Sequence, residues 1–148
     1  MLIKICRTHT TCLYTEGILL INDMKITHTI EDTISMLGPG IYSVRLNKGD
    51  NRRREIAILP DNCTGISVQP VQRFMAGGSY LTSRRYKSIG IGKPLIPGSL
   101  MNGSEVYDRL FDRLEKAEAR KEPTTLLITD DGIAHGIPIS YWSQPSHH

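Results

Sequence analysis

The feature that most constrains the fold is a series of short apolar runs, rich in β-branched residues, that fills the first half of the chain. "MLIKICRTH", "TCLYTEGILLIND" and "MKITHTIED" are separated by turn signals such as Asn22-Asp23. The pattern continues through "LGPGIYSVRLN", the polar segment "KGDNRRR", "EIAILP" and "TGISVQP". Runs of this length, bounded by Gly, Pro, Asn and Asp, are typical of strands joined by hairpins. We therefore predict a sheet of short, mostly antiparallel strands.

One segment departs from this pattern and predicts a helix over residues 103–121. Apolar residues between Val106 and Ala117 recur at helical spacing. Asn102, with Glu105 three residues later, is typical of a capping box at the start of a helix. Before it, residues 71–101 hold many glycines and prolines, which predict a long loop. The expected fold class is β-rich α+β, with one main helix.

Length and composition predict a single soluble domain over residues 1–148. The chain is 39% hydrophobic and 22% charged, which is ordinary for a globular protein. It shows no signal peptide and no spanning helix, so we expect no membrane insertion and a location in the cytoplasm or a virion. Residues 133–148 are expected to form an extended tail, in which His147-His148 resembles a tag remnant.

The three cysteines and five histidines do not predict a metal or cofactor site. The cysteines have no CxxC spacing, which argues against a zinc site or a disulfide framework. His9, His28 and His135 lack the i, i+4 spacing of a helical metal site. We therefore expect no metal and no cofactor.

Positive charge is unevenly distributed. Residues 33–104 carry ten Lys and Arg against three acids, whereas residues 105–131 carry eight acids against five bases. The basic residues gather in two clusters: Arg52, Arg53 and Arg54 at a predicted hairpin tip, and Arg84, Arg85 and Lys87, with Tyr86, before "SIGIGK". Guanidinium groups bind phosphates or carboxylates, so nucleic acid or another anionic ligand is one reading. An ordinary solvated surface is the other.

Arg7 and Glu31 are predicted to form a structural ion pair. Both lie in strand segments that are otherwise apolar or rich in threonine. A charge at such a position needs a partner, because an isolated buried charge is strongly destabilising. We expect the two side chains to pair inside the sheet.

Several short motifs follow one another in a suggestive order. They are Arg7, "TIED", "GPGIY", "GISVQP", "KSIGIGK" and the helix start "SEVYDRL", and they lie within a family-like core of about residues 4–129. This order resembles the DUF5675 family, a domain of uncertain function found in bacteria, phages and mobile elements. Family members carry a histidine in an "I-x-I-H-x-G-N" strand and a later "G-C-I-x-x-G" element. That arrangement is similar to L,D-transpeptidase (YkuD-like) domains, whose cysteine attacks a cell-wall peptide and whose histidine activates it.

At the two decisive positions the chain departs from the family. Gln69 stands where the histidine would be, and Ser88 stands where the cysteine would be. Because glutamine takes no proton at neutral pH, Ser88 lacks an evident base. The resemblance thus implies a pseudoenzyme: a binding or structural module of bacterial or phage origin, such as a virion or accessory component. Its pocket would lie near Gln69, Arg84, Arg85, Tyr86, Lys87 and Ser88, and would hold a peptide-like or anionic ligand or a protein partner.

Two alternatives stay open. The first is an enzyme that acts on cell-wall peptide through Ser88, with Lys87 or Lys93 as base. The second is a nucleic-acid-binding module that uses the two basic clusters.

Overall fold

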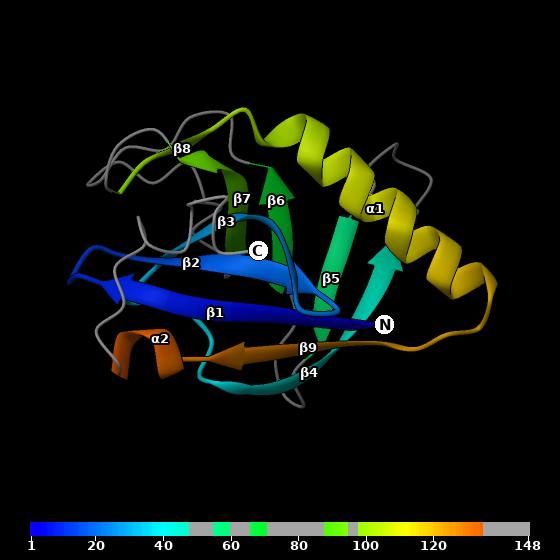
Figure 1. Ribbon diagram of the computed structural model, residues 1–148, viewed down its shortest axis with the longest axis horizontal. Helices are drawn as coiled ribbons and strands as arrows, with labels where there is room; N and C mark the ends of the chain where they lie inside the picture. The colour runs from blue at the N-terminus through cyan, green and yellow to red at the C-terminus, as the bar shows by residue number, and fades with distance from the viewer. Residues whose placement is uncertain (48–54, 60–65, 71–87, 95–97, 135–148) are drawn as a thin grey trace.

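The computed structural model describes residues 1–47, 55–59, 66–70, 88–94 and 98–134 of the chain. These residues form nine strands and two helices (Figure 1). The strands are β1 (Leu2–Thr10), β2 (Tyr14–Ile21), β3 (Met24–Asp32), β4 (Gly40–Asn47), β5 (Glu55–Leu59), β6 (Ile66–Pro70), β7 (Ser88–Pro94), β8 (Leu100–Met101) and β9 (Thr124–Thr129). The helices are α1 (Gly103–Ala119) and α2 (Asp131–Ala134).

The main sheet is curled and closes on itself. Its strands follow the order β3-β2-β1-β9-β4-β5-β6-β7, and β3 also pairs with β7. The β1–β9 and β6–β7 pairs are parallel, and the other pairs of this circle are antiparallel. The short β8 pairs with β7. The prediction of a single β-rich domain with mostly antiparallel strands and one main helix is confirmed.

The hairpin between β2 and β3 turns where the sequence predicts it. Asn22 and Asp23 both have positive φ, 51° and 65°. A two-residue turn with this backbone matches the natural twist of the flanking strands, and Asn and Asp tolerate the conformation better than most residues. The turn sets the register of the hairpin, in which Ile21 lies opposite Met24.

The core lies inside the closed sheet and under α1. Alternate residues of the strands point inward, for example Ile3 and Ile5 of β1, which are 3% and 0% exposed. Helix α1 adds Tyr107, Leu110, Phe111 and Leu114 to the same cluster. Figure 1 shows α1 lying across the end of the sheet toward which β4 and β6 run. The helix therefore seals that end with apolar side chains.

The start of α1 differs from the predicted capping box. Asn102 is the N-cap residue, but its backbone is left-handed and its side chain makes no capping hydrogen bond. Glu105 instead forms an ion pair with Arg109, one turn further along the helix. The left-handed backbone of Asn102 is the physical reason, because an N-cap side chain reaches the first turn from the extended region.

The predicted loop over residues 71–101 contains two strands, so that prediction is wrong for part of its length. β7 has glycine at alternate positions, which hides the strand signal. Gly92 allows close packing: a Cβ at this position would lie 2.8 Å from the carbonyl oxygen of Met101 in β8. A glycine inside a strand often marks such an approach of two backbones.

The end of the chain is described only as far as residue 134. α2 follows β9 directly and includes residues 133 and 134, so the start of the predicted tail is helical rather than extended. The rest of the predicted tail, with His147-His148, lies outside the described residues. Among the helices that are described, neither has the length and apolar character needed to cross a membrane.

Candidate functional site

The positions of Gln69 and Ser88 lie on adjacent parallel strands. In the register of β6 and β7, Ser88 is paired with Ser67 and Gln69 with Gly90. One strand spacing and two residues separate Gln69 from Ser88, so their Cα atoms are about 8 Å apart. Their side chains are outside the description. The backbone thus brings the two family-like positions close enough for long side chains to meet.

His28 is not near Ser88. It lies opposite Gly92 in the pairing of β3 with β7, four residues along β7 from Ser88. Four residues of strand span roughly 13 Å. A general base must lie within about 3 Å of the proton that it takes, so His28 does not serve Ser88 in this arrangement. His9 is exposed on β1, and His135 lies outside the described residues.

The two predicted basic clusters lie outside the described residues, but the strands to which they are joined are placed. Arg52, Arg53 and Arg54 belong to the connection between the end of β4 and the start of β5. Arg84, Arg85, Tyr86 and Lys87 lead into the start of β7. Because β7 is parallel to β6 and β6 is antiparallel to β5, β5 and β7 begin at opposite ends of the closed sheet. The two segments that contain the clusters are therefore joined to opposite ends of the closed sheet.

Arg7 and Glu31 form the buried ion pair that the sequence predicts. Arg7 Nε donates to Glu31 Oε2 (2.9 Å), and Nη2 donates to Oε1 (2.8 Å), with the side chains 0% and 1% exposed. Arg7 Nη2 also donates to the Leu37 carbonyl (2.6 Å), and Nη1 contacts Asp130 Oδ1 (3.4 Å). Burial lowers the pKa of Arg7, but its bonds to Glu31 and the charge of Asp130 outweigh this and raise it overall.

Gly17 lies beside this pair at a position where a side chain would not fit. It lies opposite Arg7 on β2 and opposite Thr29 on β3. A Cβ at Gly17 would lie 2.8 Å from both the Cys6 carbonyl oxygen and Thr29 Oγ1. The arginine is therefore enclosed on every side, which suits it to holding the sheet together and leaves it no access to substrate.

The outer surface of β2 and β3 holds two buried polar atoms that have no hydrogen-bond partner among the described residues. They are Glu16 Oε1 and His28 Nδ1, from side chains that are 3% and 4% exposed. The other oxygen of Glu16 accepts a hydrogen bond from the Gly98 amide (3.1 Å), so the segment before β8 crosses over this surface. Sequence reasoning considered His28 only as a metal ligand and did not single out Glu16, because their shared face depends on the register of β2 and β3.

Burial makes His28 a weak base. Desolvation, and then the positive charge of Lys25, lower the pKa of His28 to about 4. The imidazole is consequently neutral at pH 7, and its charged form is disfavoured where it lies. Because His28 resists protonation, it is a poor general base.

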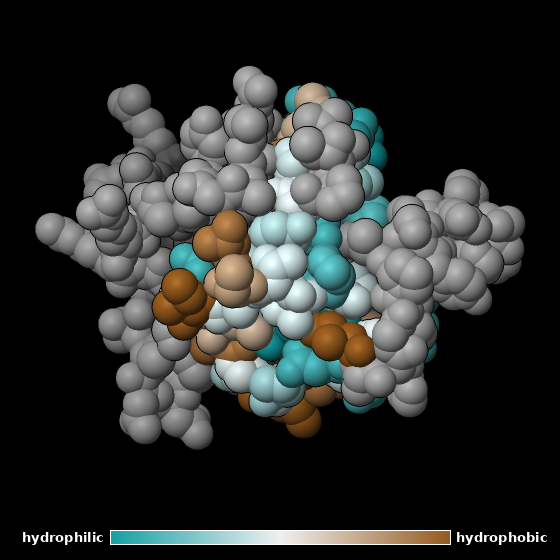
Figure 2. Space-filling view, turned by 90° about the vertical axis from the view of Figure 1, so that its left-hand side faces the viewer, coloured by the Kyte–Doolittle hydropathy of each residue, from teal (hydrophilic) through white to brown (hydrophobic). Residues whose placement is uncertain are grey.

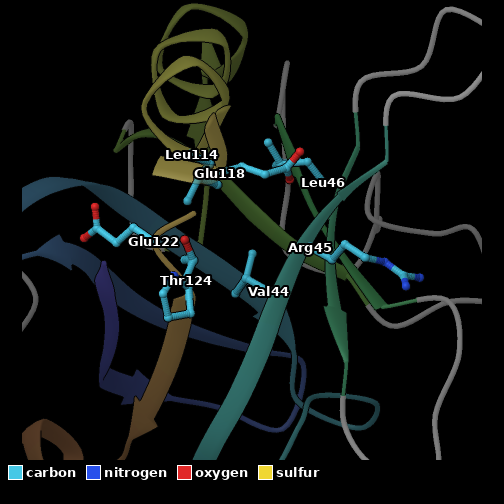
Figure 3. Close-up of a pocket in the computed structure, with 8 residues that line it drawn as sticks. Val44, Arg45, Leu46, Leu114, Glu118, Glu122 and Thr124 are labelled. Atoms are coloured by element: carbon cyan, nitrogen blue, oxygen red, sulfur yellow. The ribbon is translucent and has the colours of Figure 1, made fainter. Parts of the chain in front are cut away.

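Two hollows lie on either side of the second half of α1. The first, about 140 Å³, is lined mainly by β4 and α1, including Val44, Leu46, Leu114 and Glu118. Figure 3 shows the Arg45 side chain directed away from these residues. The second, about 200 Å³, is lined by Met1, Asn22, Arg113, Lys116, Arg120 and Glu122. The first is apolar and acidic, whereas the second is mainly basic.

The turn between β1 and β2 carries exposed apolar surface. Leu13 is 52% exposed and Ile34 is 85% exposed. The Thr33 amide donates to the Leu13 carbonyl (3.4 Å), which places the two segments side by side. Figure 2 shows apolar groups set among neutral and hydrophilic surface on the left-hand face of the molecule. Isolated apolar residues are common on protein surfaces, so they do not identify a partner.

Among the residues that the structure describes, no group of three His, Cys, Asp or Glu side chains is placed to hold a metal ion. Cys6 is buried and Cys12 is exposed, and both are free thiols. The chain matches no family model, no curated protein and no solved structure. The candidate sites accordingly rest on geometry and chemistry.

Proposed function

We propose that this protein is a non-catalytic binding or accessory module, of bacterial or phage origin, built on the frame of a DUF5675-like active site. Its ligand, a peptide-like or anionic group or a protein partner, would lie over β6 and β7 near Gln69 and Ser88. The observation that carries the proposal is the parallel pairing of these strands, with Ser67 opposite Ser88 and Gln69 opposite Gly90. This register suits a histidine and a cysteine that act together.

The residue types argue for binding rather than turnover. Glutamine offers an amide that donates and accepts hydrogen bonds but takes no proton at neutral pH. A serine hydroxyl without a base is a poor nucleophile. The described histidine closest along this part of the sheet, His28, is too far away and too weakly basic to replace the missing one. The frame is therefore suited to holding a ligand without cleaving it.

The proposed pairing of positions 69 and 88 is tested by introducing the histidine and the cysteine that the family carries there. In a background with Cys12 and Cys63 replaced by serine, Ser88→Cys is compared with the double change Ser88→Cys and Gln69→His. A histidine beside the thiol lowers its pKa, so we expect iodoacetamide to alkylate the double variant roughly tenfold faster at pH 7. Equal rates would show that positions 69 and 88 do not form a pair, and would remove the basis of the proposal.

The absence of catalysis is tested separately with the wild-type chain. Incubation with cell-wall tetrapeptides is expected to give neither exchange nor hydrolysis, and an acylating serine probe is expected to leave Ser88 unlabelled. Turnover that disappears in Ser88→Ala would establish the enzymatic alternative instead.

A further inference from the structure

Helix α1 segregates its charges onto two flanks. Three basic residues of the helix and its C-cap residue Arg120 follow one another at intervals of four, three and four: Arg109, Arg113, Lys116 and Arg120. At 100° per residue they lie within about 60° of one another around the helix axis. Four acidic residues occupy the other exposed flank: Asp108, Asp112, Glu115 and Glu118. The helix thus presents a continuous basic stripe along one side.

The second half of this stripe is part of a concave site. Arg113, Lys116 and Arg120 line the hollow of about 200 Å³ together with Met1, which precedes β1, and Asn22 of the β2–β3 turn. The left-handed backbone of Asn22 belongs to the fixed two-residue turn, so this wall is rigid. Three cationic side chains therefore converge on one hollow between the helix and the sheet.

A carboxylate of the protein already binds in this hollow. Glu122 Oε2 accepts a hydrogen bond from Arg120 (3.1 Å), and Glu122 Oε1 forms an ion pair with the amino group of Met1 (2.9 Å). These partners, the Met1 amino group first and Arg120 second, lower the pKa of Glu122. The hollow thus favours an anionic oxygen group over a neutral one.

The positive charges of Arg113 and Lys116 are available to a ligand. Neither forms an ion pair with another described residue, whereas Arg109 is bound to Glu105 and Arg120 to Glu122. A guanidinium group offers a planar pair of donors to an oxyanion, and an ammonium group adds a point charge. The volume is below the 300–1,000 Å³ range typical of sites for drug-sized ligands. It suits one small charged group.

We propose that this hollow is a binding site for a single oxyanion group, the phosphate or carboxylate of a small molecule, held by Arg113, Lys116 and Arg120. It lies on α1 and the β1 end of the sheet, away from Gln69 and Ser88, and does not depend on the function proposed for those residues. Glu122 occupies part of the site in the free protein and competes with the ligand.

The test is a titration with inorganic phosphate, followed by the backbone amide shifts at constant ionic strength. Amides around residues 113–122 and Asn22 are expected to shift together along one saturating curve. The double change Arg113→Gln and Lys116→Gln is expected to weaken binding at least tenfold. Glu122→Gln is expected to tighten binding several-fold, because it removes the competing carboxylate. All these positions are exposed, so the variants are expected to fold.

The matched control removes two positive charges from the same helix region without touching the hollow, by combining Arg109→Gln with Lys121→Gln, and each single change is measured as well. All three are expected to keep the wild-type affinity within about twofold. Equal losses in the controls and in the Arg113 and Lys116 variant would show unspecific attraction to surface charge and overturn the proposal. So would the lack of a saturating shift in wild type.

A further arm distinguishes a small ligand from a long polyanion. Binding of a short DNA duplex at the same ionic strength is measured for wild type, for Arg109→Gln and for Arg113→Gln. The proposed site predicts that duplex DNA does not displace phosphate. Duplex binding that depends equally on Arg109 and Arg113 would assign the whole stripe to nucleic acid and reject a single-anion site.

Discussion

The two ends of the closed sheet are sealed by different chemistry. At one end, α1 places Leu110, Phe111 and Leu114 over the apolar interior. At the other end, Arg7 and Glu31 meet inside the sheet, and a carbonyl and a second carboxylate complete their hydrogen bonds. An apolar contact loses stability in proportion to the atoms removed, whereas a buried ion pair depends on both partners at once. At the α1 end, the loss of stability should therefore depend on the size of the group removed. At the Arg7–Glu31 end, loss of either partner should have nearly the full effect.

The largest effect is expected from Arg7→Ala. It leaves the Glu31 carboxylate buried without its charge partner, which costs about 3–5 kcal/mol of unfolding free energy. Denaturant unfolding measures the loss. Replacing both residues with apolar ones, Arg7→Met with Glu31→Leu, is expected to restore most of it, because no unpaired charge then remains. A single variant that loses less than about 1 kcal/mol would show that the pair does not hold this end together.

At the helix end, Leu110→Ala is expected to cost about 2–5 kcal/mol, because it leaves a cavity under α1 where the side chain is 1% exposed. Leu110→Met conserves volume and is expected to cost less than about 1.5 kcal/mol. The same denaturant unfolding compares the two. The contrast with Arg7 breaks down if the methionine variant is as unstable as the alanine variant.

Titration of His28 is expected to give a smaller, pH-dependent effect. Its pKa is about 4 in the folded protein, below its usual value near 6.5, so the unfolded chain binds the proton more readily. Stability is therefore full above pH 6.5 and falls as the pH decreases from 6.5 to 4, by on the order of 2–3 kcal/mol. Unfolding measured across this range should lose that dependence in His28→Asn and keep it in the exposed control His9→Asn.

The smallest effect is expected from Asp130→Asn, at the rim of the polar end. Asp130 is 43% exposed and lies 3.4 Å from Arg7, so solvent screens most of its attraction. We expect a loss of about 0.5 kcal/mol in denaturant unfolding. A loss as large as that of Arg7→Ala would mean that the polar end needs three charges rather than two.

The strands and the ion pair could be predicted from sequence because their signals are local or depend on a simple rule. Alternating β-branched runs with an Asn-Asp turn define the β2–β3 hairpin, and two lone charges in apolar strands require each other. β7 could not be predicted, because its alternating glycines hide the strand signal, and the close approach of Gly92 to the Met101 backbone is visible only in the structure. The same holds for the left-handed start of α1 at Asn102.

The candidate sites were only partly visible in the sequence. The pairing of positions 69 and 88 follows from a parallel β6–β7 contact, which a run of short strands does not reveal. The buried Glu16 and His28 share a surface only once the register of β2 and β3 is fixed. The basic stripe could have been found by plotting α1 on a helical wheel, but its hollow also needs Asn22 and Met1 from another part of the chain.

The place of β9 in the sheet has a consequence for biosynthesis. Residues 124–129 are the last strand of the described chain, yet they lie between β1 and β4, near the middle of the strand order. During synthesis on the ribosome, the side of β1 that pairs with β9 stays unpaired until residues 124–129 have been made. Until then, the sides of β1 and β4 that pair with β9 are both open, and open strand edges are templates for pairing with other chains. Translation that stops before residue 124 would release a product prone to aggregate, and chaperones would have most to protect during that interval.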